Sequence, residues 1–291
     1  MKYLLYFFCF FVISQSYCQD SLTRSYMPLK QYLRLGIPLT GQDTLNFQLK
    51  GKDTMVLISR DFIDKRYKDR IQVEYEPKDS VFLEIYKDVV YGRPESKTRN
   101  TETMKYWKEE VKIFFAPGVP DEHSQYLMQF AHEISSEIDS LKISRVDSRD
   151  KSNFIVYYLN REHNIEYEPR ITGKTGGYYI HWRNSRIYEG AVKINTEFAT
   201  DDNYQLQLLT YHFIKSLGYF KSSDNLECES YLSDCRNFRR LTQIDREILK
   251  YHYSYGICKG VKLDDFEEMH AHMKEALRKD PNAKLYVLHE K

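Results

Sequence analysis

The sequence predicts an α/β (α+β) fold in which a mixed sheet carries a central helix and a small β-rich unit comes first. Residues 189–196 alternate between two faces, as a strand with one buried face does. Apolar side chains then repeat every three or four residues from Leu206 to Leu217, which is typical of a helix packed on a core. Short strand-like runs separated by charged turns precede both elements, at residues 54–59, 70–75 and 81–91.

The composition is that of a protein with a substantial core. Of 291 residues, 42% are hydrophobic, which is enough for one large core and a smaller second unit. The 43 basic residues almost balance the 42 acidic ones, and the formal net charge is +1. Because this balance creates no global field that attracts polyanions, we expect neither nucleic acid nor an anionic membrane surface as a partner.

The first 18 residues have the pattern of a signal peptide. Lys2 gives a short positive region, and residues 3–13 form an apolar run. Ser16 and Cys18 are the small residues that a signal peptidase requires before its cleavage point. The mature chain would then begin at Gln19, exported to the periplasm or outside the cell.

Two other roles for this end are less favoured. Acylation of Cys18, as in a lipoprotein, is disfavoured by the bulky Tyr17 before it and by Gln15 where leucine is usual. The apolar run is too short for a membrane span, and no later segment approaches the roughly 20 apolar residues that a span needs. We therefore expect no transmembrane segment in the mature chain.

A polar segment divides the mature chain into two predicted parts. Residues 92–100 contain both glycine and proline among polar side chains, which is typical of a linker. The small β-rich unit and this linker would cover residues 19–103, and the larger domain residues 104–291. Near the C-terminus, residues 263–278 have an amphipathic helical pattern, and residues 284–288 are expected to return as a strand.

The helix at the centre of the larger domain has start and stop signals. Acidic and amide side chains at residues 201–203 supply a cap and negative charge near its start, and Gly218 is a natural terminator. Leu208 and Ile214 place further apolar surface outside the main stripe. Burial on more than one side fits a central helix better than a peripheral one.

The same helix contains the frame of a zinc-peptidase motif without its ligands. The frame is H-E-x-x-H followed by a small residue and Leu-Gly, and residues 211–218 fit its spacing. Tyr211 then stands at the first His, His212 at the catalytic Glu and Lys215 at the second His. Lys221, three residues after the glycine, stands where metzincin peptidases have their third ligand.

Four further segments, in the same order as in such peptidases, extend this likeness. They look like the first and second strands, the methionine turn with Leu232 in place of methionine, and the closing Leu-Thr-x-x-Asp helix, at residues 106–113, 152–157, 230–233 and 241–249. From residue 105 to residue 274 the chain resembles an uncharacterised family of secreted bacterial zincin-like proteins related to the metzincins. The resemblance implies the order strand, helix at residues 121–141, strand, loop, strand, central helix, cysteine loop and closing helix.

The side chains at the ligand positions do not suit zinc. Zinc takes lone pairs from neutral imidazole, thiolate or carboxylate, and a helix offers two such ligands on one face at positions i and i+4. Tyr211 and Lys215 have this spacing but carry other atoms, and a protonated lysine has no lone pair. Because all the ligands and the base are replaced together, we expect no zinc, no other cofactor and no peptidase activity.

The two lysines of the frame allow two interpretations. Lys215 and Lys221 could supply positive charge where a metal once stood and bind a carboxylate or another anion. Alternatively, Lys221 is solvated and Lys215 extends along apolar surface until its amine reaches the solvent.

An aromatic segment offers a second candidate binding surface. Tyrosine is abundant, at 25 residues, and it gathers beside a pair of glycines that could form a mobile rim. Such side chains could stack on a sugar or bury a peptide; the candidates are Tyr178, Tyr179, His181 and Trp182, with Lys215 from the central helix. The alternative is a β-hairpin whose tyrosines cover the sheet.

Three cysteines remain after the predicted cleavage. Cys228 and Cys235 flank the turn at the methionine-turn position, and a disulfide between them would close a small loop in an oxidising compartment. The alternative is three buried thiols, and Cys258 has no partner in either case. A zinc site built from this pair and a histidine is disfavoured, because their spacing is not that of a metal knuckle.

These observations predict an exported zincin-like pseudo-peptidase that acts as a binding or interaction module for a peptide, protein or glycan in the cell envelope. One alternative is a metal-dependent hydrolase with non-standard ligands that the fold would bring together from His181, His212 or His252. A second alternative is a structural component of the envelope, with neither a metal nor a saturable ligand.

Overall fold

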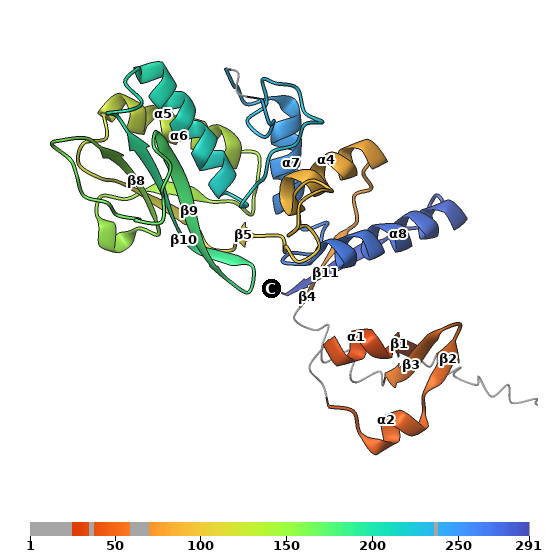
Figure 1. The fold of residues 1–291 in the computed structure, drawn as a ribbon. Helices are drawn as coiled ribbons and strands as arrows, with labels where there is room; N and C mark the ends of the chain where they lie inside the picture. The colour runs from red at the N-terminus through yellow and green to blue at the C-terminus, as the bar shows by residue number, and fades with distance from the viewer. Residues whose placement is uncertain (1–24, 35–37, 59–69, 236–237, 291) are drawn as a thin grey trace, which may run out of the picture. The chain divides into compact units, whose positions relative to one another are not determined.

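The protein combines parallel and antiparallel sheets with helices, which makes it a mixed α/β protein (Figure 1). The computed structural model describes residues 25–34, 38–58, 70–235 and 238–290. The chain divides into two compact units with the boundary after Arg70. The predicted signal peptide, residues 1–18, lies outside the described residues. Within the described ranges, no helix is both long enough and apolar enough to cross a membrane.

The first unit holds a three-stranded antiparallel sheet with the strand order β1-β3-β2. Its elements are β1 (Ser25–Pro28), α1 (Leu29–Arg34), α2 (Gly41–Leu45), β2 (Gln48–Lys50) and β3 (Asp53–Ile58). A small core forms around Met27, Tyr32 and Val56. The strand predicted at residues 54–59 is β3 over its described length.

The second unit is built around a six-stranded sheet. Strands β5, β10, β8, β6 and β7 are parallel neighbours in this order, and β9 pairs antiparallel with β10. Their bounds are β5 (Tyr106–Trp107), β6 (Val111–Phe115), β7 (Ile143–Arg145), β8 (Phe154–Leu159), β9 (Gly176–Arg183) and β10 (Arg186–Asn195). β8 is almost wholly buried, as expected for a parallel strand covered on both faces.

The strands predicted for this unit are confirmed with two differences. The alternating run at residues 189–196 lies in β10 up to Asn195, and both of its faces are buried rather than one. The run at residues 152–157 contains most of β8. Residues 106–113 hold β5 and the start of β6, so they form parts of two strands rather than one.

Two helices pack on one face of the large sheet. α5 (Asp121–Ser135) and α6 (Asp202–Ser216) share an apolar cluster with the inward side chains of β6, β8 and β10. A smaller cluster covers the other face of the sheet, where Ile171 packs with Ile155 and Ala191. α6 is the predicted central helix, and its N-cap Asp201 accepts the N–H of Tyr204. α5 ends earlier than the predicted helix at residues 121–141.

α6 ends in a turn that differs from a simple glycine stop. The left-handed conformation is taken by Tyr219, with φ of 56°, and not by Gly218. A Cβ atom at Gly218 would clash with the ring of Phe220, so the glycine is required by a close approach. The turn brings Lys221 back to the cavity that α6 lines.

A helix takes the place of the strand predicted at residues 81–91. α4 (Ser80–Tyr91) begins after Asp79, whose carboxylate accepts the N–H of Phe82. Phe82, Tyr86 and Val89 are buried at helical spacing. The strand prediction was wrong because aromatic and β-branched residues, which favour strands, dominate this segment and outweighed its helical period.

The polar segment at residues 92–100 packs into the second unit. The Arg99 guanidinium forms an ion pair with the Asp88 carboxylate of α4 at 2.8 Å, and it also donates to the Gly92 carbonyl. The boundary between the units therefore falls after Arg70 and not in the segment predicted as a linker.

The remaining elements complete the second unit. They are η1 (Arg149–Lys151), α7 (Gln243–Tyr253), α8 (Leu263–Lys279) and a two-stranded sheet of β4 (Arg70–Glu74) and β11 (Tyr286–Glu290). α7 is the predicted closing helix, α8 the predicted amphipathic helix, and β4 and β11 the strands predicted near residues 70–75 and 284–288.

Candidate functional site

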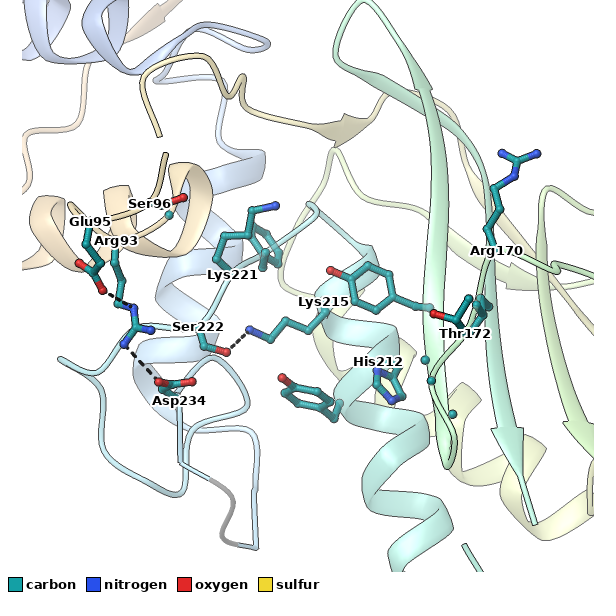
Figure 2. Close-up of a pocket in the computed structure, with 18 residues that line it drawn as sticks. Arg93, Glu95, Ser96, Arg170, Thr172, His212, Lys215, Lys221, Ser222 and Asp234 are labelled. Atoms are coloured by element: carbon teal, nitrogen blue, oxygen red, sulfur yellow. Dashed lines mark hydrogen bonds and ion pairs between the residues drawn. The ribbon is translucent and has the colours of Figure 1, made fainter. Parts of the chain in front are cut away.

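A cavity of about 680 Å³ lies beside α6 in the second unit (Figure 2). Its walls come from α6, the turn after it, the start of β9 with the loop before it, the segment after α4 and the cysteine loop. The charged side chains on these walls are Arg93, Glu95, Arg170, Lys215, Lys221 and Asp234. A cavity of this size can hold a small molecule or a short peptide.

The four side chains of the zinc-peptidase frame all line this cavity. Tyr211, His212 and Lys215 project from the last two turns of α6, where their spacing keeps them on one side of the helix. Lys221 reaches the cavity from the turn that follows. The fold thus gathers the residues that the sequence frame singles out.

Lys215 is the most deeply buried of the charged side chains in the cavity, with 3% of its surface exposed. Its Nζ donates a hydrogen bond to Ser222 Oγ at 2.7 Å, and it has no carboxylate in ion-pair contact within the described part of the chain. Burial, and then the positive charges of Arg239 and Lys221, lower the pKa of Lys215 to about 7. The alternative in which its amine reaches the solvent is therefore wrong.

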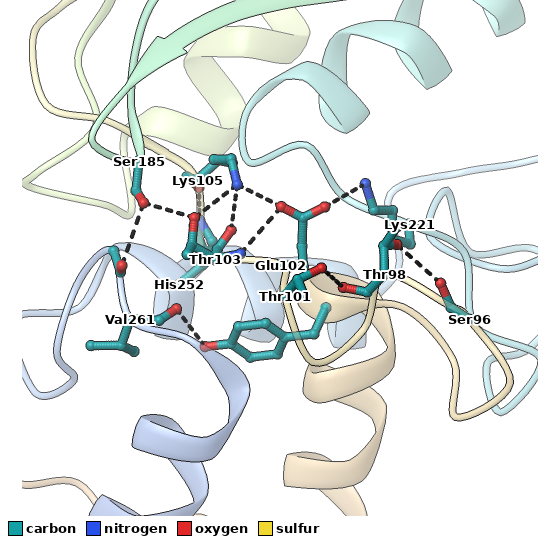
Figure 3. A network of polar contacts seen from close by, with 12 residues as sticks. Ser96, Thr98, Thr101, Glu102, Thr103, Lys105, Ser185, Lys221, His252 and Val261 are labelled. Carbon is teal, nitrogen blue, oxygen red and sulfur yellow. Dashed lines mark hydrogen bonds and ion pairs between the residues drawn. The ribbon is translucent and has the colours of Figure 1, made fainter.

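Lys221 shares one carboxylate with a second lysine (Figure 3). One oxygen of Glu102 accepts from Lys105 Nζ at 2.5 Å, and the other lies 3.7 Å from Lys221 Nζ. Lys221 Nζ also lies 3.1 Å from the centroid of the Tyr219 ring. Burial is the main cause that lowers the pKa of Lys221 to about 8; Lys105 acts in the same direction and Glu102 against it. Lys221 is thus neither fully solvated nor fully compensated.

His212 is a neutral side chain in the wall of the cavity. Burial, and then the charges of Lys215 and Arg239, lower the pKa of this imidazole to about 4. Its Nδ1 is buried and has no hydrogen-bond partner among the described residues. The Tyr178 and Tyr211 rings lie beside it, at centroid distances of 6.1 and 5.2 Å. At neutral pH His212 therefore offers one further hydrogen bond without carrying charge.

The arginines of the cavity have ion-pair partners. Arg93 contacts Glu95 at 3.1 Å and Asp234 at 3.2 Å, as Figure 2 shows. The Arg170 guanidinium lies 3.4 Å from the Glu168 carboxylate. Because both arginine charges are matched, the uncompensated positive charge of the cavity lies on Lys215 and, in part, on Lys221.

Of the predicted aromatic site, Tyr178 and Lys215 line the cavity, whereas Tyr179, His181 and Trp182 do not. Tyr179 and His181 project from the opposite face of β9, where their ring centroids are 5.0 Å apart. Trp182 lies beyond the lining, packs on Tyr219 with a centroid distance of 5.3 Å and is 39% exposed. The aromatic candidates therefore do not form one surface, and Tyr179 and His181 are hairpin residues on the sheet.

The cavity does not fit a zinc ion. The frame positions supply one phenol, one imidazole and lysine amines, with a single imidazole where zinc needs several ligands. Both carboxylates on the cavity walls are paired with Arg93. Among the described residues, no three His, Cys, Asp or Glu side chains are placed to hold a metal. His252 is fully buried with both ring nitrogens hydrogen-bonded, so it is not gathered with His181 and His212 as the hydrolase hypothesis requires.

One buried carboxylate anchors the turn between α6 and α7. Asp245 of α7 has no exposed surface and accepts hydrogen bonds from Ser230 Oγ at 2.6 Å and from the N–H groups of the next two residues. It also closes a capping box with Thr242. The hydroxyl of Tyr231 is hydrogen-bonded to that of Thr210 in α6 at 2.9 Å. The turn is therefore fixed to both helices.

Cys228 and Cys235 lie at disulfide distance, with 2.04 Å between their sulfur atoms. The loop that they close contains Asp234, which pairs with Arg93 at the cavity wall. Cys258 is a free thiol, and burial raises its pKa. Of the two alternatives for the cysteines, the structure thus has the paired one.

Loss of this disulfide is expected to lower the free energy of unfolding by about 2 to 3 kcal/mol, the chain-entropy value for so short a loop. Guanidinium unfolding of the wild type and of a Cys228→Ser/Cys235→Ser variant would measure the difference. Cys258→Ala is the matched control, because it removes a thiol and opens no loop. A loss in the double variant no larger than in this control would contradict the prediction.

Several residues of the cavity carry no signal in the sequence. Ser222 has no motif around it, Arg93 lies in a segment with the composition of a linker, and Asp234 stands in the cysteine loop. Glu102, which pairs with Lys221, is equally inconspicuous. Only contacts between distant segments bring these side chains to the site, so local spacing could not have identified them.

No family model matches this chain, and no curated protein matches its sequence. The side chains around the cavity, and the chemistry that they permit, are therefore the basis on which a function is assigned.

Proposed function

We propose that this chain is an exported zincin-like protein that lacks metal-dependent peptidase activity and acts as a binding module for a peptide, protein or glycan in the cell envelope. One observation carries the proposal. The side chains at the ligand and base positions of the frame, Tyr211, His212, Lys215 and Lys221, line a single cavity but cannot replace the zinc ligands. A cavity at the motif position that lacks zinc ligands can bind a ligand but cannot support zinc-dependent hydrolysis.

Export is supported by two independent features. The first 18 residues have the charge, length and small-residue pattern of a signal peptide. Cys228 and Cys235 lie at disulfide distance, and disulfides persist in oxidising compartments such as the periplasm and the cell exterior.

The two alternatives differ from this proposal in what they require. A hydrolase with non-standard ligands needs several metal-binding side chains in one place, and His181, His212 and His252 have separate surroundings. A structural envelope component would have no saturable ligand. A cavity of about 680 Å³ with the buried Lys215 and the partly compensated Lys221 favours a ligand.

Metal content separates the binding module from the hydrolase. The mature chain from Gln19 is loaded with zinc, dialysed and analysed by elemental mass spectrometry. We expect far less than one zinc per chain, because the lysines repel the ion and no imidazole or carboxylate set replaces the ligands. Near-stoichiometric zinc together with zinc-dependent peptide cleavage would refute the proposal.

A rebuilt motif tests the zincin-like frame itself. The variant Tyr211→His/His212→Glu/Lys215→His/Lys221→His restores three ligands and the base at positions that line the cavity. If the frame is that of a zincin, this variant gains near-stoichiometric zinc and a higher melting temperature with zinc than without it. A folded variant that binds no zinc would show that the resemblance does not extend to the geometry of the site.

A further inference from the structure

We propose that the cavity beside α6 recognises the carboxylate group of a small organic or peptide ligand, bound by Lys215 and Ser222 and supported by the positive charge of Lys221. This inference rests on the proposed binding function and names the chemical group that the site selects.

Hydrogen-bond donors without acceptors meet at one point of the cavity. Lys215 Nζ has three N–H groups and directs one to Ser222 Oγ, which leaves two of them and the serine hydrogen for a ligand. Figure 2 shows the lysine side chain extending from α6 to Ser222 across the cavity. A ligand group that accepts hydrogen bonds without donating any would satisfy these three free hydrogens.

The positive charge around the Lys215 amine also favours binding of an anion. The Lys215 ammonium is 3% exposed, and no carboxylate of the described residues is in ion-pair contact with it. Such a buried charge is unfavourable for the folded protein unless a counter-charge binds. Lys221 adds a second, partly compensated cation, because Glu102 is also bound to Lys105. A bound anion would lower the cost of both charges.

Several features favour a singly charged carboxylate over a phosphate dianion. Lys215 lies in the last turn of α6, where the helix dipole is negative and opposes extra negative charge. Glu95 and Asp234 stand on the walls. The described lining residues include no helix N-terminus, which is the usual backbone site for phosphate.

The rest of the cavity indicates that the ligand extends beyond its carboxylate. The volume of about 680 Å³ is far larger than one carboxylate needs, and the aromatic rings of Tyr178, Tyr211 and Phe220 line it. Aromatic walls bury apolar groups, so a short peptide with a free C-terminus or a comparable organic acid fits both parts.

The test compares two mixtures that differ only in the end group. A mixture of N-acetylated tripeptides of randomised sequence with free C-terminal carboxylates, and the matched mixture of C-terminal amides, are each incubated with the mature protein. Peptides retained after ultrafiltration are identified by mass spectrometry, and the affinity of the best-retained acid and of its amide is then measured by calorimetry.

We expect the acid to bind at least about tenfold more tightly than its amide, because a charge-assisted hydrogen bond is lost in the amide. Lys215→Met should abolish this preference. Lys259→Met is the matched control, since Lys259 is a second lysine whose pKa is lowered by burial but which lies outside the cavity; it should keep the preference.

The outcomes separate this inference from the function on which it rests. Equal binding of acid and amide, or a preference for the acid that survives Lys215→Met, would overturn the carboxylate site and leave a binding module in place. Retention of neither mixture would also overturn the carboxylate site. Stoichiometric zinc with peptide cleavage would instead overturn the proposed function.

Discussion

Replacement of Lys215 by methionine is expected to stabilise the folded protein by about 1 to 4 kcal/mol at pH 6, as the replacement of buried ion pairs by apolar side chains does. Lys215 is 3% exposed, and within the described part of the chain its amine has the hydroxyl of Ser222 as its hydrogen-bond partner and the Tyr211 ring at 5.4 Å. Methionine keeps an unbranched apolar chain and removes the ammonium. A residue whose loss stabilises the protein and removes a binding preference is one retained for function.

The size of this gain depends on pH in a defined direction. The pKa of about 7 for Lys215 in the folded chain lies below the value of about 10.5 for an exposed lysine. The cost of its burial is therefore fully present below pH 7 and declines as the pH rises toward the unfolded pKa. The difference between Lys215→Met and the wild type should shrink from pH 6 to pH 9.5.

Urea unfolding at these two pH values measures both effects. Lys151→Met is the matched control, because Lys151 is exposed and its replacement should change the free energy of unfolding by less than about 0.5 kcal/mol at either pH. If Lys215→Met were no more stable than the wild type at pH 6, the amine would have to be compensated within the folded protein.

Asp245→Ala is expected to destabilise the second unit by about 3 to 5 kcal/mol, among the largest effects of a single substitution. The carboxylate is completely buried and accepts hydrogen bonds from Ser230 and from the backbone of the turn, as well as from Thr242 at the start of α7. Alanine would leave these buried donors without an acceptor and open a small cavity.

Denaturant unfolding followed by tryptophan fluorescence would measure this loss, since Trp107 is buried in the same core. Glu229→Ala is a suitable comparison, because Glu229 lies next to the same turn but forms an exposed ion pair with Arg240. Its removal should cost less than about 1 kcal/mol. A similar small loss in Asp245→Ala would mean that the turn does not depend on the buried carboxylate.

Regular periodicity made much of the fold predictable. The alternation at residues 189–196 and the apolar stripe of α6 identified a strand and a helix correctly, although residues 190–194 are all buried because both faces of the sheet are covered. The sequence did not predict α4, because most of its residues favour strands. Its helical period is evident from the side chains that are buried in the structure. The packing of residues 92–100 depends on the ion pair between Arg99 and Asp88, which local composition does not encode.

The candidate site was predictable only in part. The spacing of Tyr211, His212 and Lys215 on one helix fixes their common direction, so their place in one cavity follows from the sequence frame. Glu102 and Ser222 take part through contacts that depend on the whole fold. The relation to zincins remains a proposal, and the rebuilt motif is its direct test.

Tyr219, in its left-handed turn, also belongs to a closed circuit of side chains. Its ring contacts Trp182 and Lys221, the indole of Trp182 lies 5.0 Å from Lys105 Nζ, and both lysines contact Glu102. The indole is exposed, whereas Lys221 lines the cavity. The exposed Trp182 ring is therefore linked to Lys221 of the cavity by two sets of contacts, one through Tyr219 and the other through Lys105 and Glu102.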